Sequence, residues 1–434
     1  MGFLSFLKSK PEPAASPANA APAAAQPEAA PAPSAEAGAI VCRAEIVDER
    51  HSLSGYRFST PEPEAAMLAS LVAAGVPEFA RQRVALVPLG LDALAADLHL
   101  PLVAPHTVFL FDRKAAELPV DEFAARLTAL RASGSKVALR GVTLAEEEAS
   151  LLGVCDMVVL HLNEHALADF QTLSKQLRLR YPDLRLVVDG VESWDERRMC
   201  ASWGANYFMG HFLTTVDQAD PDAKIDQSRM TSIELLNLLR TDAELPAMIE
   251  VAKRDPGMTY QVLQWANAPG SGQTTKVTSL QQAFMVLGRN QLYRGLTVSM
   301  FRLGGGATKD RDESLLEIAL TRARFLETCS KLPQAKRDEL FLVGLLSLFD
   351  VLLGVPMANL VGKMQLSDDI RDVLLGQEGV YGPYLMMVLL LERNKVERAL
   401  DIAATLEVDV DGLPQVGQAA FEWAQESIQQ TSAD

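Results

Sequence analysis

Short runs of β-branched and aliphatic residues alternate with longer stretches of helical apolar spacing between residues 39 and 216. The short runs have the length and composition of buried strands, and stretches such as 120–132 and 166–179 repeat apolar residues every three or four positions. We expect strands at 40–46, 84–89, 107–111, 136–139, 157–162, 184–188 and 207–212. This alternation predicts a parallel sheet or a TIM-like barrel, with any chemistry at the carboxyl ends of the strands.

From about residue 221 the apolar period becomes helical and stays helical. Thr231 and Ser232 can each cap a helix, with Glu234 close to capping-box spacing and an apolar face following. The run 384–391 is apolar all round and should be buried in a helical bundle. The chain is therefore predicted to be a multidomain α/β plus all-α protein, with domains at 39–220 and 221–434.

The first 38 residues are predicted to be a tail and linker. Residues 11–38 are almost wholly Ala, Pro, Ser and Glu, a composition that cannot bury a core. Residues 1–10 place four apolar side chains before two lysines, which leaves two readings: a frayed tail or a weak contact with an acidic membrane surface. The apolar run is too short for a secretory signal, and no later run approaches a membrane span, so we expect a cytoplasmic protein.

Composition and charge exclude some classes of function. The 434 residues are 48% hydrophobic, enough for more than one core, and the formal net charge of −16 disfavours binding to nucleic acid by bulk electrostatics. The four cysteines have no CxxC spacing and are expected to be buried, reduced thiols.

Two segments near the end of the α/β half carry a family pattern. Residues 186–193 read Leu-Val-Val-Asp-Gly-Val-Glu-Ser, and 203–212 read Trp-Gly-Ala-Asn-Tyr-Phe-Met-Gly-His-Phe. They resemble the closing part of the EAL domain, the cyclic di-GMP phosphodiesterase barrel, whose pattern is "GVE" followed by "G-x-x-Y-x-Q-G-Y-x-F". Met209 and His211 depart from it. The stretch 53–58 is similar to the opening of the same family, so the resemblance covers 39–220.

This resemblance implies a site for two divalent cations, built from converging oxygen ligands. Most of those positions are substituted here, by Arg57, Pro88, Phe111, Arg140, Val159 and His161. Glu192 survives, with Asp189 nearby. A one-residue shift at Phe111 recovers only Asp112 as an acid.

We therefore expect a vestigial pocket formed by Arg57, Arg140, Asp189 and Glu192, with no metal and no cofactor. The favoured reading makes these residues structural ion pairs. The alternative is that two arginines reverse the charge of the pocket, so that it binds cyclic di-GMP or another anion without cleavage. His161 and His165 are four residues apart but fall on different predicted elements, so we do not expect them to share a metal.

A second family pattern lies in the helical half. Residues 254–267 resemble the HDOD core "K-x-D-P-x-L-x-x-x-L-L-x-x-x-N-S", and 276–288 resemble "I-x-S-[IL]-x-x-A-[IL]-x-x-L-G". We expect structural roles for the motif residues: Asp255 and Ser279 cap helices, Pro256 opens one, and Gly288 ends one. The remaining motif residue is Asn267.

HDOD domains are relatives of the HD phosphohydrolases, which hold a metal with a His-Asp pair. Here Ser347 and Leu348 stand at the pair, and His211 is the last histidine in the chain. An EAL domain followed by an HDOD domain resembles a class of bacterial signal-transduction proteins. The resemblance implies a non-catalytic adaptor in a cyclic di-GMP-related pathway, with kinases or phosphodiesterases as protein partners. The alternatives are a nucleotide sensor without hydrolysis and, least favoured, an active phosphodiesterase with rearranged ligands.

Overall fold

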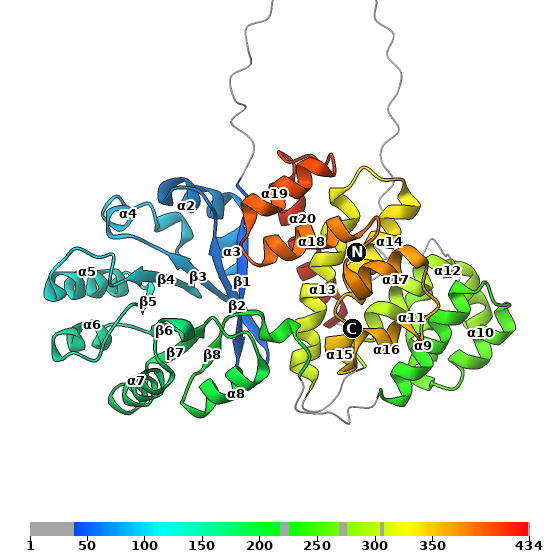
Figure 1. The fold of residues 1–434 in the computed structure, drawn as a ribbon, viewed down its shortest axis with the longest axis horizontal. Helices are drawn as coiled ribbons and strands as arrows, with labels where there is room; N and C mark the ends of the chain where they lie inside the picture. Colours follow the sequence, from blue (N-terminus) through cyan, green and yellow to red (C-terminus); the bar gives the residue numbers. More distant parts are fainter. Residues whose placement is uncertain (1–38, 218–224, 269–275, 304–307, 433–434) are drawn as a thin grey trace, which may run out of the picture.

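The computed structural model describes residues 39–217, 225–268, 276–303 and 308–432 (Figure 1). The predicted tail and linker at 1–38 lie outside these residues, as does most of the expected domain boundary near 220. None of the helices in the described part of the chain is long and apolar enough to cross a membrane.

Within the described residues, eight strands close into a barrel in the order of the chain. β1 pairs antiparallel with β2 and β8, and the other neighbours are parallel. The strands are β1 (Cys42–Asp48), β2 (Leu53–Ser59), β3 (Val84–Pro88), β4 (Thr107–Asp112), β5 (Lys136–Arg140), β6 (Met157–His161), β7 (Arg185–Asp189) and β8 (Tyr207–Phe208).

Alternation along the strands separates an inner and an outer apolar layer. The barrel interior is filled by Ile46, Leu86, Val108, Leu110, Ala138, Met157, Val159, Val187 and Met209. The outer faces pack on helices α2 (Glu64–Ala73), α3 (Val76–Phe79), α4 (Leu91–Ala95), α5 (Val120–Ala132), α6 (Ala149–Gly153), α7 (Leu167–Arg180) and α8 (Trp194–Ser202), with short 3₁₀ turns η1 (Leu100–Leu102), η2 (Glu146–Glu148), η3 (Leu162–Glu164) and η4 (His211–Thr214) between them.

The expected barrel is confirmed, with two differences in its strands. β2 was not among the expected strands, because Ser54 and Arg57 interrupt its apolar run. β8 is shorter than the expected 207–212 because Gly210 adopts φ 139°, after which η4 begins. A Cβ on Gly210 would lie 2.1 Å from the carbonyl oxygen of Val191, so this turn requires glycine.

The C-terminal part is helical throughout its described residues. Its helices are α9 (Gln227–Arg240), α10 (Leu245–Ala252), α11 (Pro256–Asn267), α12 (Leu280–Ser299), α13 (Lys309–Cys329), α14 (Gln334–Leu346), α15 (Phe349–Leu353), α16 (Met357–Val361), α17 (Asp368–Gly376), α18 (Gly382–Glu392), α19 (Val396–Thr405) and α20 (Leu413–Ser432). The expectation that a helix starts near Thr231 is wrong. Asp226 caps α9 by accepting from Arg229 N, and the Thr231 hydroxyl bonds back to the Gln227 carbonyl at 2.9 Å.

The two parts meet where the barrel lacks a helix of its own. Each parallel strand is followed by a crossover segment that covers the barrel, but β1 runs directly into β2. α18 packs against β1 and α13 against β2, with α20 beside them, so the helical part covers the bare hairpin (Figure 1). A single apolar core consequently runs from the outer layer of the barrel into the helical bundle.

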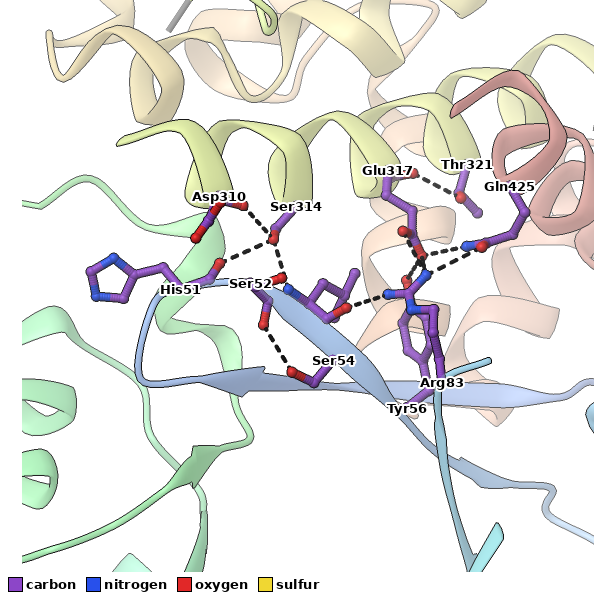
Figure 2. Close-up of polar contacts among 11 residues, drawn as sticks. His51, Ser52, Ser54, Tyr56, Arg83, Asp310, Ser314, Glu317, Thr321 and Gln425 are labelled. Atoms are coloured by element: carbon purple, nitrogen blue, oxygen red, sulfur yellow. Dashed lines mark hydrogen bonds and ion pairs between the residues drawn. The ribbon is translucent and has the colours of Figure 1, made fainter. Parts of the chain in front are cut away.

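Polar contacts cross this interface at two places on α13 (Figure 2). The buried carboxylate of Glu317 accepts from Tyr56 at 2.7 Å and from Arg83 at 2.8 Å, and it also accepts from the Gln425 amide. The Ser314 hydroxyl accepts from the Leu53 backbone N–H at 2.9 Å. Glu317 therefore joins β2, the residue just before β3, and α20 to one helix.

Replacing Glu317 with alanine should destabilise the whole chain by about 3 kcal/mol, because Arg83 would lose its carboxylate in a largely buried setting. The matched control is Glu313→Ala on the same helix, where the side chain is 56% exposed and pairs with Lys309 at 3.8 Å. We expect about 0.5 kcal/mol or less for the control. Urea unfolding of the two variants measures the difference, and equal losses would contradict this role of Glu317.

Candidate functional site

The carboxyl ends of the barrel strands carry a polar layer. Arg57 is the register partner of the inward-facing Leu86. His161 and Asp189 follow the inward-facing Val159 and Val187, respectively, by two residues on their strands. Because side chains alternate along a strand, these positions face the barrel mouth above its apolar interior. Asp112 and Arg140 occupy the same level on β4 and β5, where they are direct register partners.

Two ion pairs organise this layer. Arg57 bonds Asp189 across the mouth, and Arg140 bonds Asp112 at 2.7 Å. Of the four residues expected in the vestigial pocket, the structure thus brings Arg57 and Asp189 together. Arg140 pairs elsewhere, and Glu192 is exposed in the turn before α8, where its backbone N–H donates to the Glu196 carboxylate at 2.7 Å.

The ring of Phe111 points away from the polar layer of the mouth. Its ring is buried on the outer face of β4 against Phe123, with ring centroids 6.0 Å apart. Asp112 is the residue that faces inward, since one step along a strand reverses the face. The acid recovered by a one-residue shift of the alignment is therefore the one at the mouth.

The mouth opens into a pocket of about 770 Å³. Arg57, Ser59 and Arg140 line it from the barrel together with acidic side chains, and Asn394 lines it from the turn between α18 and α19. Asn394 was missed by sequence reasoning, because nothing in its local pattern places the helical part over the mouth. Its φ of 56° belongs to the left-handed region, which asparagine tolerates.

The polar layer does not fit a pair of divalent cations. Two guanidinium groups lie in it and take up Asp112 and Asp189, and a positive group beside a cation is repulsive in a partly buried site. Among the described residues, no three His, Cys, Asp or Glu side chains converge on one point. His161 ends β6 and accepts from Asn163 N at 3.3 Å, whereas His165 follows η3.

The HDOD-like motif residues hold helix ends and a loop closure. Asp255 accepts from Met258 N at 3.1 Å at the start of α11, which Pro256 begins, and Ser279 accepts from Gln282 N at 3.2 Å at the start of α12. Gly288 has φ 68° and ψ 169° and divides α12 into two helical segments. These residues therefore have local structural contacts.

Asn267 closes the segment between α11 and α12. Its amide donates to the carbonyls of Leu263 and Val277, and its oxygen accepts from Val277 N, each at 2.8 Å. The side chain therefore substitutes for backbone pairing between two chain segments.

An arginine contacts Ser347, one of the two residues that were aligned with the His-Asp pair of the HD enzymes. Ser347 and Leu348 follow the end of α14, and Arg322 of α13 donates to the Ser347 hydroxyl at 2.6 Å. The same guanidinium forms a two-point pair with Glu392 at 2.9 and 3.0 Å. Burial raises the pKa of the nearby Asp350 carboxyl in the first turn of α15.

Comparison with known proteins assigns the helical part. The model of the family described as "HDOD domain" matches residues 230–355. These residues form an HDOD domain. The expected order, a closed barrel followed by HDOD helices, is thereby confirmed.

Two curated relatives match part of the chain. The uncharacterised protein YuxH of Bacillus subtilis is 26% identical over 226 residues, which are 52% of this chain and 55% of YuxH. The cyclic di-GMP phosphodiesterase CdgJ of Vibrio cholerae is 22% identical over 247 residues, 56% of each chain. The matches thus span about half the length of these relatives.

Solved structures with EAL domains are similar to the N-terminal part. They include the YkuI protein of Bacillus subtilis in complex with c-di-GMP and calcium (14% identity, 58% of this chain, 73% of that chain, TM-score 0.34). An EAL domain protein of Listeria monocytogenes is another (14% identity, 41% of this chain, 87% of that chain, TM-score 0.32).

Replacing Asn267 with alanine should cost about 1–2 kcal/mol of unfolding free energy, because the Val277 backbone groups lose their partners. The control is Asn290→Ala, an exposed asparagine on α12, which should change stability by about 0.5 kcal/mol or less. Thermal or urea unfolding of both variants measures the difference. An Asn267 variant as stable as the control would contradict the closure role.

Proposed function

We propose that this chain is a non-catalytic signalling protein of the EAL–HDOD type. It acts through contacts with regulatory proteins, such as kinases or phosphodiesterases, in a pathway linked to cyclic di-GMP. The HDOD domain and the partial similarity to a protein named as a cyclic di-GMP phosphodiesterase support the pathway. The partners themselves are inferred from the loss of ligand residues in both domains.

The observation that carries the proposal is the pair of Arg–Asp contacts at the barrel mouth. Phosphodiester hydrolysis by a two-metal site needs free carboxylates to hold the ions and activate water. Here Arg57 and Arg140 neutralise Asp189 and Asp112 at the level where such ligands would converge. The HDOD half adds support, because Arg322 lies beside Ser347 where a His-Asp pair would stand.

One observation favours a second function, binding of cyclic di-GMP without hydrolysis. The mouth pocket of about 770 Å³ is lined by Arg126 of α5 and by the guanidinium groups of Arg57 and Arg140 at the strand ends, and a guanidinium group can bind phosphate oxygens in a two-point geometry. Both are partly exposed, with side-chain exposures of 27% for Arg57 and 55% for Arg140. Each guanidinium group would exchange a carboxylate partner for a phosphate. Its contribution to the binding free energy is therefore the difference in free energy between those two ion pairs.

Calorimetric titration of the purified chain with cyclic di-GMP, with and without Mg²⁺ or Ca²⁺, tests these functions together. Chromatography of the same sample for the linear product follows. The adaptor predicts neither heat nor product. The sensor predicts heat without product, with binding weakened about tenfold or more, equivalent to about 1.4 kcal/mol, in Arg57→Ala and Arg140→Ala but not in the exposed control Arg180→Ala.

Metal-dependent formation of linear product would overturn the non-catalytic proposal. Glu192→Ala then distinguishes a true activity from a contaminant, because a rearranged site would depend on the one acid that the EAL resemblance preserves. If neither heat nor product is found, pull-downs with the intact chain are the direct test of protein partners.

A further inference from the structure

A groove of about 450 Å³ lies between the barrel and α20. Ligand pockets typically have volumes of about 300–1,000 Å³. One wall is α3 with the turn before it, the other is α20, and the Gln418 amide ties the two walls together by donating to the Ala74 carbonyl at 2.8 Å. Phe79 is only partly buried, so the groove presents apolar surface to water. The apolar lining consists of Phe58, Ala74, Val76, Phe79 and Phe421.

The charges along this groove are mainly negative. Three exposed glutamates line it: Glu78 of α3 and Glu422 and Glu426 of α20. Among the described residues, the only base in its lining is Arg83, whose guanidinium already pairs with Glu317 at 2.8 Å and donates to the Leu53 carbonyl at 2.6 Å. The uncompensated charge is therefore carboxylate, and the groove fits a ligand that is both apolar and positively charged.

The described fold begins close to the groove. Ile40 and Val41, near the first described residue, line a neighbouring cavity together with Gln418 and Phe421, and these last two residues also line the groove. Residues 1–38 precede this point. At about 3.3 Å per extended residue, residues 11–38 span at most about 90 Å, so residues 1–10 can reach the groove of their own chain.

Residues 1–10 have the composition that the groove requires. They carry four large apolar side chains and then two bases: Phe3, Leu4, Phe6, Leu7, Lys8 and Lys10. Residues 11–38 contain no lysine, arginine, leucine, isoleucine, valine, methionine or aromatic residue. Only the first ten residues of this stretch therefore combine apolar anchors with positive charge. A tether holds such a segment at an effective concentration of about 1 mM, so that even a weak site is largely filled.

We propose that the groove between α3 and α20 is a docking site for residues 3–10 of the same chain. The apolar side chains of this segment fill the groove, and Lys8 and Lys10 pair with the glutamates along its rim. Docking ties the segment to the barrel and to the helical part at once. It also withholds the apolar side chains of the segment from membranes and from other proteins.

Fluorescence anisotropy of a labelled, end-capped peptide of residues 1–10 tests the site on the full chain. The tail variant, with Phe3, Leu4, Phe6 and Leu7 each changed to serine, alters no residue of the described fold and frees the groove. It should bind the peptide with a Kd of about 0.1 mM, and the wild type, whose own tail competes at about 1 mM, should bind it about tenfold more weakly. Equal binding to the two chains, or no binding to the tail variant, would overturn the proposal.

Charge reversal in the groove tests where the peptide binds. Glu422→Lys with Glu426→Lys, added to the tail variant, changes two exposed residues of α20 and should weaken peptide binding at least tenfold. The matched control is Glu146→Lys with Glu147→Lys, which makes the same change in net charge at two exposed residues of η2, outside the groove. The control should bind the peptide like the tail variant. Equal weakening by both pairs of substitutions would show attraction by overall charge and contradict docking in the groove.

Two measurements on the wild type and the tail variant separate other occupants of the groove and other targets of the tail. Light scattering should give the same mass for both chains. A dimer that is lost in the tail variant would place the tail in the groove of a second copy and rule out docking within one chain. Phosphatidylserine vesicles should leave the wild type in the supernatant on sedimentation, whereas co-sedimentation that is lost in the tail variant would show that the tail binds membranes instead.

Discussion

The antiparallel β1–β2 hairpin imposes the constraint on which the arrangement of the whole chain depends. A barrel built from strand–helix units covers itself, but a hairpin has no crossover helix, so its outer face would meet water. The helical part supplies the missing cover, with α13 and α18 packed on the hairpin. Glu317 then accepts from the buried Tyr56 hydroxyl and pairs with Arg83, so these polar groups beneath the cover have a charged partner.

Much of the architecture could be predicted from local pattern. Parallel strands buried on both faces are nearly continuous apolar runs, so most of them stand out, whereas β2 carries Ser54 and Arg57 and does not. The start of α9 shows the limit of capping signals: Thr231 and Ser232 fit the pattern, but Asp226 provides an earlier cap and the helix simply runs through them. Local capping rules identify candidate capping residues, and competition between these candidates decides where the helix begins.

The types of residue at the barrel mouth could be predicted from the sequence. Which of these residues form ion pairs with each other could not. Arg57 and Arg140 were identified at strand ends, yet the partner of Arg140 depends on whether Phe111 or Asp112 faces inward, which a one-residue uncertainty in register leaves open. Asn394 and Arg322 illustrate a second limit. Both meet their neighbours through tertiary packing across many residues, and no periodicity or motif carries that information.

Charge is handled differently at the two places where acids gather. At the barrel mouth, where water reaches the side chains, Asp112 and Asp189 each have an arginine, and such partly exposed pairs contribute little to stability while fixing the local charge near zero. Between the barrel and the helices the buried Glu317 also has an arginine, Arg83, and its carboxylate accepts from Tyr56 and Gln425 as well. The pairing there matters more for stability, because removing one partner of a buried ion pair costs about 3–5 kcal/mol.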